Sequence, residues 1–195
     1  MIVTYFGIIC ASFVLGRVNR AHAWSHKLRH HYRVLRQATV VVAVVLGLQQ
    51  TALGDDNVKL RMLPDAEFLD IVTRDISDRQ ALATADFTRS IYSEDCTFQD
   101  EIDTYKINEY VKGTKALFDG TWSRVELTTV PEFVDPNRRQ VEYRFKETLA
   151  FKVPLNPKVD LTGKVRLVRD PEGLVISSRE FWDASVAEVL QRVYF

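Results

Sequence analysis

The spacing of apolar residues predicts helices after position 64 of this 195-residue chain. Pro64 and Asp65 suit the first turn of a helix, because proline's missing N–H is not needed there and an acid favours the N-terminal dipole. Apolar residues then recur at helical spacing, at Phe68, Leu69, Val72 and Ile76. A second helical piece is expected from about Asp78, carrying Leu82, Phe87 and Ile91.

A short strand and a longer helix are expected next. The alternation around Cys96 and Phe98 is typical of a strand. From about Thr104 to Asp119 the apolar residues return to helical spacing, at Ile107, Tyr110, Val111, Leu117 and Phe118. This stripe predicts an amphipathic helix that buries one face.

After Trp122 the period of the pattern changes to two, which predicts strands near 125–129, 141–153, 159–167 and 174–181. Turn residues separate them, and a short helix is expected from Ala184 to about Arg192. Helices followed by a four-strand antiparallel meander predict an α+β domain, with the N-terminal helices packed on one face of the sheet. Because long strands tend to curl, we expect a cone whose mouth is a ligand pocket or a partner-binding face.

Charge divides the chain at Gly54. All 26 acidic residues follow this point, whereas the first 54 residues hold six basic residues and all four histidines. The remaining 141 residues therefore carry 20 bases against 26 acids, a net charge of about −6. A negative domain lacks the positive footprint that nucleic acid requires, so we expect no nucleic-acid partner. It also lacks histidine, the commonest catalytic base.

The first 54 residues are interpreted as a cleavable presequence in three parts. Residues 1–23 form a short apolar signal that ends in a small-x-small site, 24–37 a basic acid-free spacer, and 38–54 a second apolar segment. This order resembles the stacked presequences of algae with complex plastids, which implies a plastid location and extends to the thylakoid lumen. The secretory pathway, or an anchor at 38–48, is the alternative. Membrane contact is expected only through this segment.

Residues 55–195 are long enough for one domain. Cys96 is its only cysteine, so it contains no internal disulfide. We expect Cys96 to be a buried packing residue, because no histidine is present to activate it. No motif for a cofactor is found, and the acidic residues around position 100 match no loop that wraps a hard cation. We therefore expect no cofactor and no metal.

The order of these elements resembles the nuclear-transport-factor-2-like (SnoaL-like) superfamily. It resembles in particular an uncharacterised branch found in plants, algae and cyanobacteria. The resemblance covers essentially residues 65 to 195. It rests on Ile91-Tyr92, Asp95-Cys96, Phe98-x-Asp100, Tyr110, Leu117-Phe118, Val125-Glu126-Leu127, the Phe151 to Pro157 loop, and Gly173-Leu174-Val175 leading to Trp182. It implies a cone-shaped fold.

Asp100 is the candidate catalytic residue. In ketosteroid isomerase-like members of this superfamily, an aspartate at the matching place is the general base. Burial in an apolar cone would raise its pKa toward the range useful for proton abstraction. The matching tyrosine donor of those enzymes is absent, since no tyrosine occurs between Asp55 and Ile91. The alternative role is a turn cap before Thr104.

Two hypotheses on function remain open. The first is a non-catalytic domain that binds an apolar small molecule or a protein partner, with a homodimer through the exposed sheet face as a further option. The second is a small isomerase or cyclase that uses Asp100 as base. Both use one candidate pocket: Tyr92, Phe98, Asp100, Tyr110, Phe118, Trp122, Tyr143, Phe145, Phe181 and Trp182. Tyr105 and Phe151 belong to the same aromatic set. Charged residues of the strands, including Glu147 and Glu180, are expected on a solvated face.

Overall fold

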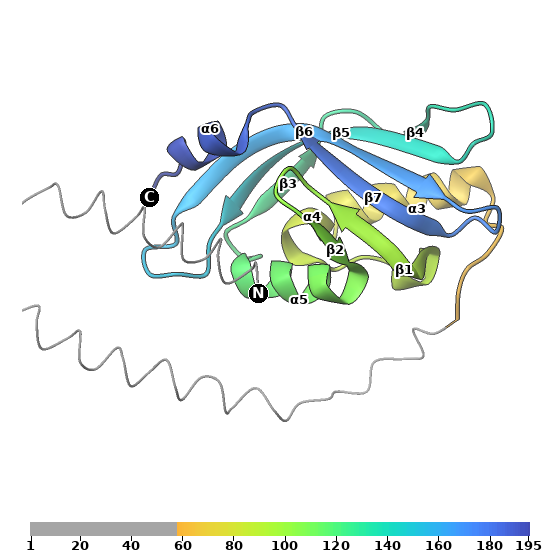
Figure 1. The fold of residues 1–195 in the computed structure, drawn as a ribbon, viewed down its shortest axis with the longest axis horizontal. Helices are drawn as coiled ribbons and strands as arrows, with labels where there is room; N and C mark the ends of the chain where they lie inside the picture. Colours follow the sequence, from red (N-terminus) through yellow and green to blue (C-terminus); the bar gives the residue numbers. More distant parts are fainter. Residues whose placement is uncertain (1–57) are drawn as a thin grey trace, which may run out of the picture. The chain divides into compact units, whose positions relative to one another are not determined.

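The computed structural model describes residues 58–195 (Figure 1). The expected presequence segments 1–23, 24–37 and 38–54 lie outside the described residues. Among residues 58–195, no helix has the length and apolar character needed to cross a membrane.

A single mixed sheet forms the larger part of the domain. Its strand order is β2-β1-β7-β6-β5-β3, with β4 also paired to β5. All neighbours are antiparallel except β1 and β7, which run parallel. The strands are β1 (Tyr92–Gln99), β2 (Thr104–Lys106), β3 (Arg124–Leu127), β4 (Glu132–Phe133), β5 (Gln140–Ala150), β6 (Lys158–Arg169) and β7 (Val175–Trp182). The expected meander is thus present as β3-β5-β6-β7, and β1 and β2 extend it beyond β7.

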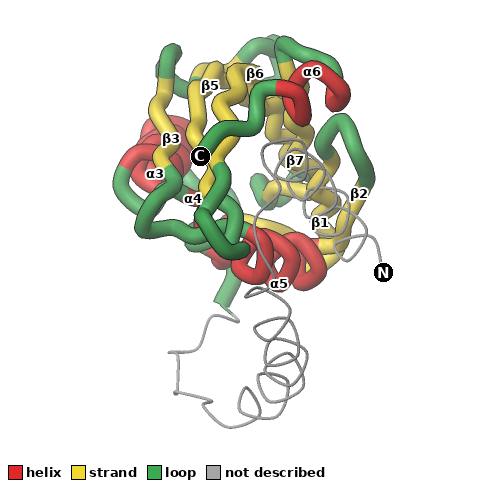
Figure 2. The backbone as a smooth tube through the Cα atoms, turned by 90° about the vertical axis from the view of Figure 1, so that its left-hand side faces the viewer, coloured by secondary structure: helices red, strands yellow, loops and turns green. Residues whose placement is uncertain are grey.

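The helices α3, α4 and α5 lie on one side of this sheet, and α6 lies beyond the end of β7 (Figures 1 and 2). This arrangement confirms the expected α+β class and the curved, mainly antiparallel sheet. The helices are α3 (Asp65–Ser77), α4 (Ala81–Thr84), α5 (Ile107–Leu117) and α6 (Val186–Gln191), with a 3-10 turn at Arg89–Ile91.

The expected helix from Asp78 to Ile91 is wrong in its extent. Only α4 forms, because Ala85 takes a left-handed conformation (φ 51°) that ends the helix. Gln80, also left-handed, accepts from the N–H of Val125 (2.6 Å) and donates to its carbonyl (3.0 Å). These two hydrogen bonds fix α4 against β3, and a contact so distant in sequence leaves no periodic signal.

Helix α5 begins later than the expected Thr104. Thr104–Lys106 pair with β1 as the edge strand β2 instead. Helix formation starts only after Lys106, whose backbone N–H donates to the Glu109 carboxylate (3.0 Å) and so caps the first turn. The loop between β1 and β2 therefore lies over one end of the sheet, where it carries Asp100.

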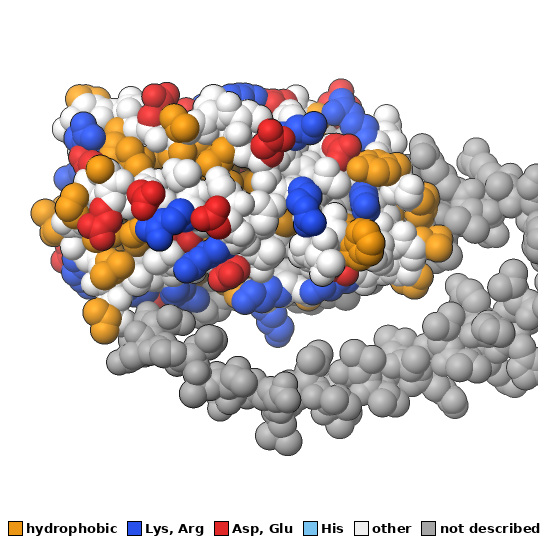
Figure 3. Space-filling model, turned by 180° about the vertical axis from the view of Figure 1, so that it is seen from behind, with side chains coloured by type: hydrophobic (Ala, Val, Ile, Leu, Met, Phe, Trp, Pro, Cys, Tyr) orange, Lys and Arg blue, Asp and Glu red, His pale blue; other side chains and the backbone are white. Residues whose placement is uncertain are grey.

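Residues of β5 alternate strictly between the two faces of the sheet. Val141, Tyr143 and Phe145 are buried on the helix-covered face, whereas Arg144 and Lys146 are exposed on the outer face. On that outer face Glu142 pairs with Lys164 and Arg166 (3.3 and 2.6 Å). The expected solvated face is confirmed: Arg144 and Lys146 are exposed, and Arg144 and Arg166 form ion pairs there. Seen from behind, acidic and basic side chains are interspersed over the described part of the surface (Figure 3).

Candidate active site

A pocket lies between α5 and the inner face of the sheet, and α6 closes one end of it. Its unfilled space is about 890 Å³, including the part that opens to solvent. The apolar wall comes from every layer of the domain, which explains why folding is required to assemble it. Its members are Leu82, Ile102, Leu117, Phe118, Leu149, Phe151, Val159, Leu161, Trp182, Val189, Leu190 and Val193.

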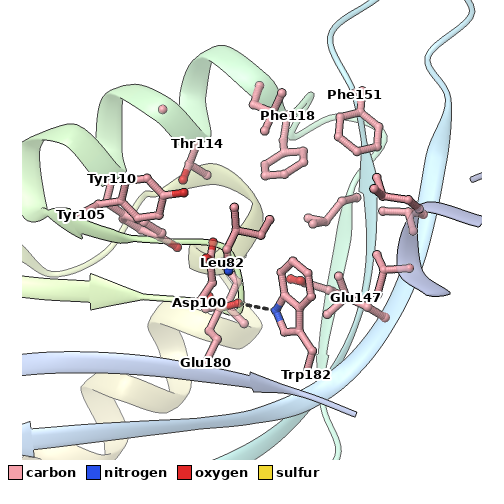
Figure 4. Close-up of a pocket in the computed structure, with 18 of the residues that line it drawn as sticks. Leu82, Asp100, Tyr105, Tyr110, Thr114, Phe118, Glu147, Phe151, Glu180 and Trp182 are labelled. Carbon is pink, nitrogen blue, oxygen red and sulfur yellow. Dashed lines mark hydrogen bonds between the residues drawn. The ribbon is translucent and has the colours of Figure 1, made fainter. Parts of the chain in front are cut away.

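Four of the lining side chains are acidic, and none of those that the structure describes is Lys, Arg or His. Glu109 lies on α5. Asp100 follows β1, Glu147 lies on β5 and Glu180 on β7. Figure 4 shows Glu147 across the hollow from Tyr110 and Thr114 of α5, whereas Asp100 and Glu180 border a small hollow together with Tyr105 and Tyr110. The pocket is therefore an apolar hollow with an acidic lining.

Asp100 is held by the loop that it begins. Its Oδ1 accepts the backbone N–H groups of Ile102 (2.7 Å) and Asp103 (2.8 Å). Burial raises the pKa of the Asp100 carboxyl, and these two hydrogen bonds act in the opposite direction. The turn-cap role expected from the sequence is thus observed, and the same side chain lines the pocket.

Glu180 lies next to Trp182 on the same strand face. The indole Nε1 donates to Glu180 Oε2 (3.3 Å), the contact drawn as a dashed line in Figure 4. Burial, and secondly the charge of Asp100, raise the pKa of Glu180 to about 7. Its carboxyl is consequently balanced between the acid and its conjugate base near neutral pH.

Glu147 is the most deeply buried acid of the pocket, with a relative exposure of 3%. Its Oε2 has no hydrogen-bond partner among the described residues. Burial, with a contribution from the charge of Glu180, holds the pKa of Glu147 well above its usual range. A buried carboxyl without a partner costs free energy, so folding alone gives no reason for a glutamate at this position.

Two tyrosine hydroxyls add hydrogen-bond donors. Burial raises the pKa of Tyr105 to about 12 and that of Tyr110 well above its usual range, so both hydroxyls keep their protons. Thr114 is a hydrogen-bond partner of Tyr110. The site accordingly combines carboxyl groups that can accept or give a proton with phenols that stay protonated and can donate hydrogen bonds at neutral pH.

The structure brings four of the ten expected pocket residues together: Asp100, Tyr110, Phe118 and Trp182. Tyr105 and Phe151, from the wider aromatic set, line the same space. Phe98 lies behind the wall, where its ring stacks on Tyr110 with centroids 4.2 Å apart. It borders a smaller hollow beside the main one.

The other five expected residues lie elsewhere. Tyr92 packs against Phe87 and Phe98 in an aromatic cluster. Tyr143 and Phe145 are buried in the core away from the pocket lining. Trp122 is 55% exposed and lies beneath Lys158, and Phe181 lies on the outer face among cations, with Arg179 4.5 Å from its ring centroid. Phe181 is one position out of phase with the inward residues Glu180 and Trp182.

Sequence reasoning missed Glu147 and Glu180, which it assigned to the solvated face. That assignment is wrong, and the alternation of residues along the strand already indicated that Glu147 faces inward. Glu147 has the same period-two phase as Val141, Tyr143 and Phe145, which marks it as inward-facing. Its place near the strand end hid this signal. The contribution of α6 had no such signal, since six residues are too few for a clear period.

Cys96 is fully buried, and burial raises the pKa of its thiol to about 12. The expected packing role is confirmed.

Within the part of the chain that the structure describes, no cluster of three or more His, Cys, Asp or Glu residues is arranged to hold a metal ion.

No protein-family model matches the chain, and no curated protein matches it either. Solved structures do resemble it. One is a Catenulispora acidiphila protein described as having a ketosteroid isomerase-like fold (17% identity, 63% of this chain and 91% of the other, TM-score 0.46). Others are a nuclear-transport-factor-2-like superfamily protein from Salmonella enterica (13%, 63% and 92%, 0.46) and a candidate polyketide cyclase from Pseudomonas putida (10%, 68% and 99%, 0.48). At such identities and scores the likeness concerns the arrangement of elements alone.

Proposed function

We propose that this domain binds a small, largely apolar molecule in the pocket beneath α5. The observation that carries the proposal is the unfilled space itself. A concave, largely apolar site with a few polar groups is the usual form of a ligand site, and this hollow opens to solvent, where a ligand could enter. The Phe118 and Phe151 rings, 5.4 Å apart, would contact a flat ligand body.

A neutral fluorescent probe tests this proposal. N-phenyl-1-naphthylamine is expected to bind the protein with enhanced emission. The variant Leu161→Trp, which places an indole in the hollow, should weaken binding at least tenfold. Lys146→Ala on the outer face is the matched control and should bind as the parent does. Equal binding by both variants would place the probe elsewhere and contradict the proposal.

A second candidate function is acid–base catalysis of the isomerase or cyclase type, with Asp100 as the base. It is supported by Asp100 and Glu180 lining one hollow, both with raised pKa, together with the protonated hydroxyls of Tyr105 and Tyr110. Such a set can remove a proton from carbon and donate hydrogen bonds to the oxygen that becomes negative.

The second candidate predicts exchange of carbon-bound hydrogen with solvent. With 2-tetralone in D₂O, the protein should accelerate deuterium incorporation next to the carbonyl, as followed by proton NMR. Asp100→Asn keeps an acceptor for the loop N–H groups but removes the base, so exchange should fall by about 10²-fold or more. Exchange no faster than in buffer, under conditions where 2-tetralone binds, would leave the non-catalytic function.

A homodimer through the outer sheet face is also proposed. The interspersed charges of that face support it, because a two-fold axis can set Glu142 of one copy against basic residues of the other. Molecular mass in solution tests it: the parent should have twice the monomer mass, and Glu142→Lys should be monomeric. A monomeric parent at micromolar concentration contradicts the dimer.

The plastid location and the plant, algal and cyanobacterial branch remain proposals from the sequence. They are supported by the three-part order of residues 1–54 and by the residue pattern of 65–195. Mass spectrometry of the natural N-terminus tests the location. A terminus near Asp55 supports lumen delivery, one near Trp24 a secretory or stromal-side form, and an intact Met1 contradicts the presequence.

A further inference from the structure

The acids Asp100, Glu147 and Glu180 of the pocket have no cationic partner among the described residues. Ten ion pairs are found among the described residues, and none of them includes Asp100, Glu147 or Glu180. Elsewhere in the same domain acids are paired, as Asp65 is with Arg138 and Arg169. The absence of cations from the pocket is thus a local property, and buried charges are otherwise paired or bound to a ligand.

Glu147 gives the second, independent observation. Its side chain is 3% exposed and lines the hollow, with Oε2 lacking any partner among residues 58–195. A leucine or methionine would fill the position at no such cost. The position is paired with β6 on one side and with β3 on the other, and it lies between the inward residues Phe145 and Leu149, where apolar residues are otherwise the rule. A positively charged ligand group would provide the missing partner, and its charge would favour the ionised carboxylate against the burial that raises the pKa of Glu147.

Glu180 and Trp182 lie beside this group. Their side chains face the hollow from β7, and Glu147 lines the same hollow from β5. An indole face attracts cations, and two carboxyl groups around it would add direct ion pairs. Away from these acids the walls are hydrocarbon and aromatic rings, including Phe118, Phe151 and Leu161.

We propose that the ligand of this pocket is a cationic amphiphile, an amine or quaternary ammonium whose charged group lies among Glu147, Glu180 and Trp182 and whose apolar body lies against Phe118 and Phe151. The inference deepens the proposed function and rests on it. It also states what the pocket rejects: fatty acids, phosphate esters and other anions would place like charges together, which opposes binding.

Three probes with one body and different charge test this inference by titration calorimetry on the full chain at pH 7.5. They are 4-phenylbutylamine, 4-phenylbutan-1-ol and 4-phenylbutanoate. The amine should bind at least tenfold more tightly than the alcohol, and the carboxylate more weakly than either. Glu147→Gln and Glu180→Gln should each remove most of the preference for the amine while leaving alcohol binding within about twofold. Glu142→Gln, on the outer face, is the control and should behave as the parent.

The outcomes separate the two levels of the proposal. Alcohol and amine binding with equal affinity would overturn the cationic ligand and leave the apolar pocket standing. Failure of the amine and the alcohol alike would overturn both. The comparison of the three probes on the parent protein needs no variant. It therefore tests the preference for a cation even if a glutamine variant does not fold.

Discussion

The carboxyl group of Glu147 shows how a single residue separates function from stability in this domain. It lies inside a sheet whose inner face is otherwise built from Val141, Tyr143, Phe145 and Leu149. Removing a buried polar group that has no partner is usually neutral or stabilising, whereas removing one that is satisfied is costly. The change in the free energy of unfolding when Glu147 is replaced therefore shows whether its carboxyl group has a structural partner.

Glu147→Leu is expected to raise the free energy of unfolding by about 1–2 kcal/mol at pH 8, because it removes the desolvated carboxyl and keeps apolar contacts. Urea unfolding followed by circular dichroism measures this. Leu149→Ala is a comparison at the adjacent inward position and should cost about 2–4 kcal/mol. A large loss of stability in Glu147→Leu would show that the glutamate has a structural partner.

Asp100 is a residue with two roles that conservative substitution can separate. Its Oδ1 accepts two backbone N–H groups, and an asparagine can accept them in the same way. We expect Asp100→Asn to unfold within about 0.5 kcal/mol of the parent, and Asp100→Ala to lose about 1–2 kcal/mol. Thermal denaturation of both variants gives the difference. If Asp100→Asn is as unstable as Asp100→Ala, the charge itself maintains the loop.

At the scale of the element, the pairing of β6 with β7 depends on Gly163. A Cβ built on Gly163 would lie 2.4 Å from the backbone carbonyl oxygen of Phe181 and 3.1 Å from the ring of Phe145. A backbone atom cannot move away as a flexible side chain would. This close approach fixes the end of β7 that presents Glu180 and Trp182 to the pocket.

Gly163→Ala is thus expected to destabilise the domain by about 2 kcal/mol or more and to weaken probe binding, since β7 must shift. Gly120→Ala provides a milder comparison, because there the added Cβ meets only the side chain of Thr84 at 3.0 Å. Chemical denaturation of both variants measures the contrast. Equal stabilities would contradict the proposed role of Gly163.

At the scale of the whole molecule, the raised pKa values predict how stability depends on pH. Residues 55–195 contain no histidine, so carboxyl groups dominate the titration between pH 4 and 8. Glu180 has a pKa of about 7 against an ordinary 4.5, and the pKa of Glu147 is raised as well. The folded state then holds protons that the unfolded chain releases above pH 4.5.

The free energy of unfolding should therefore fall as the pH rises from about 4.5 to 7, by on the order of 3 kcal/mol for Glu180 alone, and then level off for that group. Urea denaturation at pH 5, 6, 7 and 8 follows the change. Glu180→Gln should flatten the profile, whereas Glu142→Gln should not. Stability that rises over this range would refute the raised pKa.

The main elements followed from local pattern. The period of 3.6 predicted α3 and most of α5, and the period of two predicted β5, β6 and β7, because a half-buried element repeats its apolar residues at its own period. The errors arose where contacts distant in sequence decide the conformation. Gln80 fixes α4 through Val125, and Thr104–Lys106 join β1 as an edge strand instead of starting the helix.

By itself, the sequence determined the α+β class, the change of charge at Gly54 and the inward phase of Val141, Tyr143 and Phe145 on β5, since these depend on composition and on residue spacing along the chain. Only the tertiary structure decided which inward residues meet. Glu147, Asp100 and Glu180 come from three strands or their ends, and the curvature of the sheet under α5 brings them around one hollow, whereas Tyr143 and Phe145, in the same phase, are packed into the core. Residue spacing determines on which face of a strand a side chain lies, but tertiary packing determines which side chains of different strands meet.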